Sequence, residues 1–241
     1  MEIDIIELWG SMNGLVRAVV IALTLQALLS IYVVIDRVIL LLVSGARSRK
    51  FAAQCGSTLL AGDYRAALEI TAQHQKSHLA RLIETGVSVF LDRRDGGHTR
   101  EKAAELCARA LERKGENLSE NLNRGLTALA STGSTAPFIG LLGTVLGILN
   151  AFKLIGEEAS GGMGTIGPAI AEALIVTGYG LLVAIPSVLM FNWLSGWIAR
   201  YEAGLANAGS ELIDQLEAGT TRRAEPAPVL QETSEAVPSA A

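Results

Sequence analysis

The chain has 241 residues, of which half are apolar and 18% are charged, and its net charge is −4. Such an apolar composition favours a membrane protein over a soluble globular one. The charge is small and no cluster of lysine and arginine stands out, which argues against binding to nucleic acid.

Residues that could carry soluble enzyme chemistry are missing from the sequence. There is no glycine-rich phosphate loop, no Ser/His/Asp arrangement and no metal-ligand spacing, so we expect no enzyme activity, no cofactor and no metal. His74, His78 and His98 lie in polar segments, and we expect them at the surface. Cys55 and Cys107 lack a CxxC spacing and are predicted to be reduced thiols.

The first apolar stretch, residues 15–43, is long enough to cross a membrane and is uncharged from Ala18 to Ile35. A cleaved signal peptide is the competing interpretation. It fails because the preceding residues 1–14 contain Glu2, Asp4 and Glu7 instead of a basic region. We therefore expect an uncleaved first transmembrane helix.

Residues 44–125 are predicted to form a helical segment outside the membrane. Gly62 and Asp63 are placed as the end of one helix and the cap of the next, and residues 95–97 read Asp-Gly-Gly, which predicts a loop. From Thr99 onward, apolar residues repeat at helical spacing as far as Leu129. No proline or turn cluster interrupts them, so we expect one long helix that continues into the second span.

The second and third spans are predicted at residues 126–155 and 164–198, joined by an external turn at 156–163. Helical spacing continues beyond the third span through residues 199–218, and the tail 219–241, rich in Pro, Ala, Glu and Thr, is predicted to be disordered. The expected fold is all-α, with the second and third transmembrane helices extended into a helical bundle.

Lysine and arginine set the expected orientation. They gather after the first span, at Arg47, Arg49 and Lys50, and between residues 65 and 124, whereas the 156–163 turn has none. We therefore expect the N-terminus outside, in the periplasm, and the C-terminus in the cytoplasm.

Small and hydroxylated residues recur in the two later spans. Gly140 and Thr144 are four residues apart in the second span, and Ala173, Thr177 and Gly180 form a similar stripe in the third. Ordinary close packing of helices explains most such glycines and alanines. The threonines have two interpretations: each bonds to its own i−4 carbonyl, or both line a polar seam between the helices.

Glu172 is an ionisable residue inside the third span, where a charge is costly and usually functional. The alternative is a helix-start residue, with Pro168 in the first turn and the acid favoured by the helix dipole. Glu172 and Thr177 are five residues apart and so point about 140° apart on a helix. They cannot face the same point.

Two motifs, Ala136-Pro-Phe-Ile-Gly-Leu-Leu-Gly-Thr-Val-Leu-Gly-Ile148 and Gly167-Pro-Ala-Ile-Ala-Glu172-Ala-Leu-Ile-Val-Thr177 with the residues up to Pro186, resemble the MotA/TolQ/ExbB proton-channel family. The three-span layout resembles ExbB and TolQ more than MotA, which has four spans. One departure is Gly178-Tyr179, where the family usually has small or aliphatic residues. We expect Tyr179 to be a packing residue.

The resemblance implies a subunit of the bacterial inner membrane that assembles as a homopentamer around an ExbD/TolR-like single-span partner, whose aspartate carries protons. It places Thr144 and Thr177 on the proton pathway and Glu172 as the intramembrane acid. A TonB/TolA-like protein or a motility effector is the further partner it implies.

The function implied is that of a stator subunit which uses the proton motive force to drive its partner. Such motors energise outer-membrane transport, envelope maintenance or gliding motility, and the sequence leaves these three open. The alternative is a structural membrane scaffold that conducts no ions.

Overall fold

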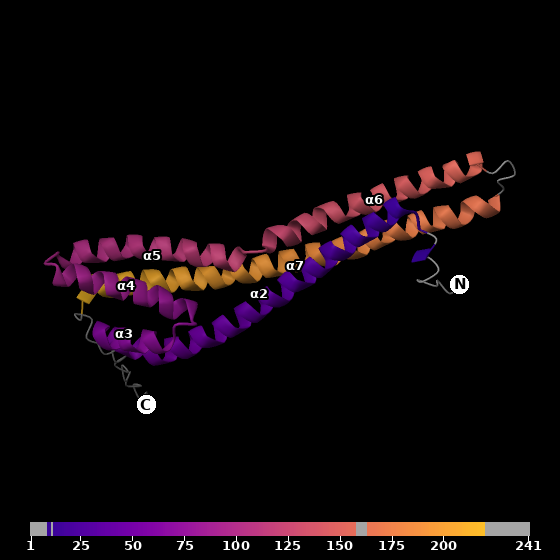
Figure 1. The fold of residues 1–241 in the computed structure, drawn as a ribbon. Coiled ribbons are helices and arrows are strands. Elements are labelled where there is room, and N and C mark those ends of the chain that lie inside the picture. The colour runs from indigo at the N-terminus through magenta and orange to yellow at the C-terminus, as the bar shows by residue number, and fades with distance from the viewer. Residues whose placement is uncertain (1–8, 11, 158–162, 220–241) are drawn as a thin grey trace, which may run out of the picture.

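The structure is a computed structural model, which describes residues 9–10, 12–157 and 163–219. Its helices form an elongated molecule (Figure 1): α2 Gly14–Leu60, α3 Tyr64–Gln73, α4 His78–Asp95, α5 Arg100–Asn123, α6 Leu126–Glu157 and α7 Met163–Ala218. The described residues contain no strand, so the all-α prediction is confirmed. The predicted disordered tail, most of the N-terminal segment and most of the 156–163 turn lie outside the described residues.

Three stretches of helix are long and apolar enough to cross a membrane. They are Gly14–Leu60, Arg100–Lys153 and Gly167–Ala218. Each overlaps most of one predicted span and extends well beyond it at one end, and the second stretch takes in both α5 and α6. At 1.5 Å per residue, the 56-residue α7 is about 84 Å long, far more than the roughly 30 Å of a bilayer core.

One end of the molecule is a bundle of α2, α6 and the first part of α7, in which α2 packs along the other two (Figure 1). Here α6 and residues 163–198 of α7 form the membrane hairpin. Val16, Val19 and Leu23 of α2 are buried against Val176 and Val183 of α7. Large apolar side chains point outward instead, among them Leu25, Phe138 and Leu182 at 62%, 71% and 67% exposure. That distribution suits a lipid environment.

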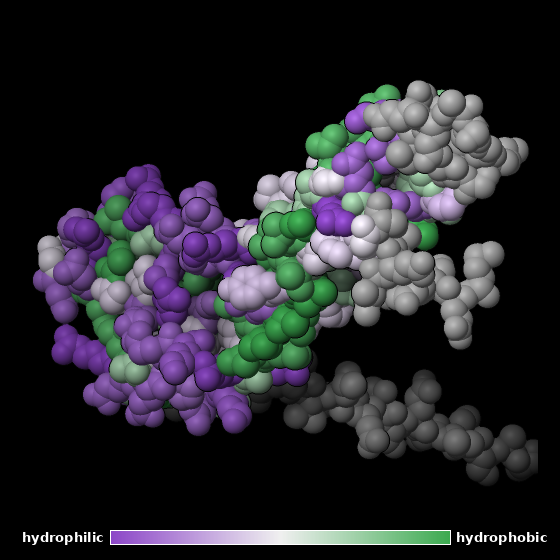
Figure 2. All heavy atoms as spheres, turned by 45° about the vertical axis from the view of Figure 1, so that its right-hand side comes forward, coloured by the Kyte–Doolittle hydropathy of each residue, from purple (hydrophilic) through white to green (hydrophobic). Residues whose placement is uncertain are grey.

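The other end is the helical bundle, formed by α3, α4, α5 and the C-terminal parts of α2 and α7 (Figure 1). Its core contains Phe51, Phe90, Leu111, Leu118 and Leu212. Figure 2 shows hydrophilic residues over this end and a hydrophobic zone beside it, over the middle of the long helices. The expected apolar face of α5 is buried as predicted: Ala104, Cys107, Leu111, Leu118 and Leu122 are at most 5% exposed.

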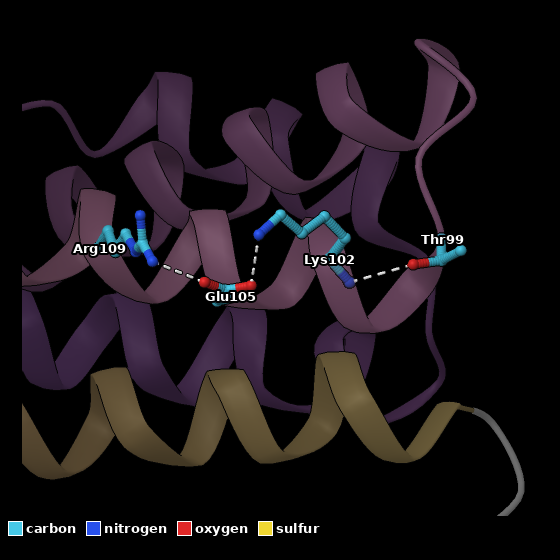
Figure 3. A network of polar contacts seen from close by, with 4 residues as sticks. All are labelled: Thr99, Lys102, Glu105 and Arg109. Carbon is cyan, nitrogen blue, oxygen red and sulfur yellow. Dashed lines mark hydrogen bonds and ion pairs between the residues drawn. The ribbon is translucent and has the colours of Figure 1, made fainter.

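The helix ends in the bundle follow local rules. Gly62 has a φ of 75°, and Asp63 caps α3 by accepting a hydrogen bond from the Ala66 N–H, both as predicted. Thr99 caps α5 in the same way, through Lys102 N–H. On the next turn Glu105 forms ion pairs with Lys102 and Arg109 at 2.7 and 2.6 Å (Figure 3).

The expectation of one unbroken helix from Thr99 into the second span is wrong. Helix α5 ends at Asn123 and α6 begins at Leu126. Between them Gly125 has a φ of 87°, which L side chains rarely adopt. A Cβ at Gly125 would also lie 3.2 Å from Val33 of α2, so glycine allows both the turn and the close contact with the first span.

Candidate functional site

The site lies where α6 and α7 come into close backbone contact. A Cβ at Gly180 would lie 2.7 Å from the Ala136 carbonyl oxygen and 3.0 Å from Gly140 Cα. At Gly147 an added Cβ would lie 2.6 Å from that of Ala173. The two backbones therefore touch through glycine, as expected for helices that associate in lipid by close packing.

Thr144 and Thr177 meet at this crossing. Their hydroxyl oxygens are hydrogen-bonded to each other. The Thr177 hydroxyl also reaches the Gly140 carbonyl across the helix interface at 3.0 Å. Thr144 lies 3.3 Å from the Ala173 carbonyl on α7 and 3.4 Å from its own i−4 carbonyl, Gly140. Their contacts thus run mainly between the helices, which favours the seam over isolated back-bonding.

This arrangement gives the hydroxyl pair two directions of donation. Thr144 can donate to Thr177 while Thr177 donates to the Gly140 carbonyl. In reverse, Thr177 donates to Thr144 while Thr144 donates to the Ala173 carbonyl. Each hydroxyl is both donor and acceptor, so the pair can reverse without movement of heavy atoms. A group that passes or bridges a proton needs this property.

Glu172 lies on α7, half-buried, and belongs to a different side of the helix from Thr177. Because α7 is helical over both residues, the expected separation of about 140° holds. The helix-start interpretation of this acid is wrong, since α7 begins at Met163 and Pro168 lies inside the helix. Glu172 is nine residues beyond Met163, whereas the helix dipole acts within the first turn.

The first span is tied to the hairpin by polar side chains that sequence reasoning did not find. Thr24 donates to the Val20 carbonyl at 2.8 Å, so the Tyr179 hydroxyl, 3.1 Å away, is the donor to Thr24. Tyr179 is thereby a link between α7 and α2. Three further pairs join α2 and its N-cap residue Asn13 to the hairpin: Asn13 with Asn150, Gln26 with Thr135, and Ser30 with Ser187.

In the helical bundle, His78 corrects the expectation that the histidines lie at the surface. It is 9% exposed, and its Nδ1 lies 2.9 Å from the Ser44 hydroxyl. A continuous row of hydrogen bonds then connects Ser44, Tyr201, Ser48 and Ser77. Burial, followed by the positive charge of Arg81, lowers the pKa of His78 below its ordinary value.

The two cysteines are also buried in the bundle. Burial raises the pKa of the Cys107 thiol to about 11 and raises the pKa of Cys55 as well. Both are therefore protonated, unreactive thiols near neutral pH. Within the part of the chain that the structure describes, no three His, Cys, Asp or Glu side chains are grouped to hold a metal ion.

Comparison with known proteins gives one family. The model of the MotA/TolQ/ExbB proton channel family matches residues 68–207, which include the Thr144–Thr177 crossing. A biopolymer transport protein ExbB of Pseudomonas putida is 41% identical over 118 residues, 48% of this chain and 36% of that protein. The ExbB of Salmonella typhimurium strain LT2 is 34% identical over 138 residues, 57% of this chain and 56% of that protein.

The chain is also similar to a TolQ protein. The Tol-Pal system protein TolQ of Pseudomonas aeruginosa is 43% identical over 91 residues, 38% of this chain and 39% of that protein. The matches to these three relatives span between about a third and about half of their lengths.

Proposed function

Because the chain belongs to the MotA/TolQ/ExbB proton channel family, we propose that it is the multi-pass subunit of a proton-driven stator in the bacterial inner membrane. The three apolar helices cross the membrane, with the N-terminus in the periplasm and the helical bundle and C-terminus in the cytoplasm. The positive-inside rule supports this orientation, since Arg47, Arg49 and Lys50 follow the first span directly.

The observation that carries the proposal is the hydroxyl pair Thr144–Thr177 at the glycine-packed crossing. In the proposed assembly the chain forms a pentamer, and each pair contributes one wall of the proton path. The hydroxyls bridge protons, through water, to a carboxylate that titrates inside the pore. An ExbD/TolR-like single-span partner supplies that carboxylate as an aspartate.

Glu172 has a separate part in this proposal. It lies about 7.5 Å along α7 from Thr177 and on another side of the helix. We assign it to a contact with a neighbouring helix or subunit within the membrane. The partner system that the motor drives is a TonB/TolA-like protein or a motility effector.

The test is the double substitution Thr144→Val with Thr177→Val. Valine keeps the branched shape and removes both hydroxyls, so assembly should persist while proton flux falls more than about tenfold, equivalent to about 1.4 kcal/mol of barrier. Flux is measured as acidification of vesicles that contain the complex, under an imposed membrane potential. Undiminished flux in the double variant would rule out the pore-lining role.

Two control variants test whether the loss of flux comes from removal of these two hydroxyls. Thr144→Ser with Thr177→Ser keeps both hydroxyls and should retain flux, and Thr127→Val removes an exposed hydroxyl elsewhere on α6. Glu172→Gln tests the acid by itself. If partner movement in wild-type membranes continues after a protonophore dissipates the gradient, the chain is instead a structural scaffold without ion conduction.

A further inference from the structure

A groove of about 690 Å³ lies between α5 and α7 in the helical bundle. Leu111 of α5 and Leu205 of α7 contribute apolar walls. From α4 only Leu82 reaches it, and this leucine is 3% exposed. Leu82 therefore closes the floor, and the groove opens on the side of the α5–α7 pair that faces away from α4.

Carboxylates form the rim of this groove. Glu112, Glu116 and Glu120 stand four residues apart on α5, and Glu202 faces them from α7. Glu202 is held there by a hydrogen bond of 2.8 Å from the Asn123 amide. Among the residues that the structure describes, no lysine or arginine lines the groove.

The acidic rim differs from the rest of α5. Two turns earlier, Glu105 is neutralised by Lys102 and Arg109 (Figure 3). None of the four rim carboxylates forms an ion pair with a residue that the structure describes. Like charges at i and i+4 on one face destabilise a helix. A cationic ligand would remove that cost.

Two glycines leave extra space in the groove. Gly115 on α5 and Gly209 on α7 are among its lining residues, and a Cβ added at either would meet no atom closer than 3.8 Å. The end of the groove nearer the membrane hairpin is lined by Glu120, Asn123 and Glu202. It lies next to the Gly125 turn, where the hairpin begins. A helix that leaves the membrane alongside the hairpin enters the groove directly.

We propose that this groove binds the basic, amphipathic segment that directly precedes the membrane span of the single-span partner. The inference rests on the proposed function, which supplies that partner. Cytoplasmic flanks of membrane spans carry an excess of lysine and arginine. Such a segment would place its cations on the four rim carboxylates and its apolar side against Leu82, Leu111 and Leu205.

A photo-crosslinking experiment locates the occupant. The crosslinking amino acid p-benzoyl-phenylalanine replaces Ser119 or Ser210, which both line the groove, in the full chain co-expressed with the single-span partner in membranes. Ser88, exposed on α4 and outside the groove, is the control position. We expect crosslinks from both groove positions to the partner residues just before its span, mapped by mass spectrometry. Crosslinks to a second copy of this chain, or none, would overturn the proposal.

A charge swap tests the recognition itself. Glu112→Lys with Glu116→Lys should reduce the crosslink at least about tenfold, and replacing the partner's basic residues by glutamate should restore it. Glu69→Lys with Glu217→Lys makes the same change in net charge at exposed positions outside the groove and should leave the crosslink unchanged. Equal losses in both variants would contradict specific binding in the groove.

Further measurements separate this proposal from the proposed function. If the lysine variant fails to fold, Glu112→Gln with Glu116→Gln is used in its place. Crosslinking of the wild type should also weaken between about 50 and 500 mM salt, because salt screens the attraction between the carboxylates and the basic segment. If the partner co-purifies and protons flow but the groove crosslinks fail, only the groove proposal falls. If no single-span partner co-purifies with the wild type, both fall.

Discussion

The membrane hairpin and the helical bundle are packed in opposite ways. In the hairpin, small residues such as Gly140 and Gly180 lie between the helices, and large apolar side chains such as Phe138 point outward. In the bundle, large side chains such as Phe51 and Leu212 fill the core. Burial of apolar area drives association in water, whereas lipid offers no such drive and leaves close backbone contact to hold helices together.

The first prediction tests this contrast by truncating one large side chain in the bundle core and one on the outer face of the first span to alanine. Phe51→Ala, at 1% exposure in the bundle core, should lower the free energy of unfolding by about 3–5 kcal/mol. Leu25→Ala, at 62% exposure on the first span, should change it by much less, because lipid surrounds this side chain before and after unfolding in the membrane. Thermal and denaturant unfolding of the purified chain in detergent measure both.

Equal losses in Phe51→Ala and Leu25→Ala would contradict the contrast. A large loss confined to Leu25→Ala would show that a protein surface covers the outer face of α2.

The second prediction concerns glycines in the hairpin, where enlarging a buried small residue should destabilise the protein. Gly180→Ala would place a Cβ 2.7 Å from the Ala136 carbonyl oxygen, and backbone cannot yield as a side chain can. We expect a loss of about 1–3 kcal/mol, with proton flux reduced because the Thr144–Thr177 pair separates. Gly178→Ala, two residues away with no atom within 4 Å, is the matched control.

The control substitution should be neutral or slightly stabilising in the chain itself, since alanine favours a helix by about 1 kcal/mol over glycine. Detergent unfolding and vesicle flux report on both variants. If Gly180→Ala behaves like Gly178→Ala, the close crossing is not required.

Much of the fold followed from the sequence because local chemistry dictates it. The three long apolar runs, the Gly62–Asp63 helix junction and the apolar face of α5 depend on spacing along the chain alone. The meeting of Thr144 and Thr177 was foreseen as one of two interpretations, because small residues mark the faces of helices that approach closely.

Features set by partners distant in the sequence were not foreseen. The turn at Gly125 lies in close contact with Val33, and a glycine inside a helical pattern is not by itself the sign of a turn. The links from Thr24 to Tyr179 and from Ser44 to His78 join residues 155 and 34 positions apart. A polar residue in a polar segment gives no local sign that tertiary packing will bury it.

The third prediction uses His78, the buried ionisable group in the bundle. Its lowered pKa means that the unfolded chain binds a proton more readily, so stability is complete above about pH 6.5 and falls as the pH drops toward the native pKa. The slope can reach at most about 1.4 kcal/mol per pH unit, the value for one proton. Unfolding measured between about pH 7.5 and 5.5 avoids most carboxylate titration.

His78→Gln should remove this slope, whereas His98→Gln, at an exposed position, should preserve it. The same slope in wild type and His78→Gln would contradict the assignment. Protonation of His78 also fixes the direction of a row of hydrogen bonds. A protonated Nδ1 must donate to Ser44, so the hydroxyls of Ser44, Tyr201 and Ser48 must all donate in the direction of Ser77. Acidification therefore acts on α2, α4 and α7 together, where the bundle meets the membrane-spanning helices.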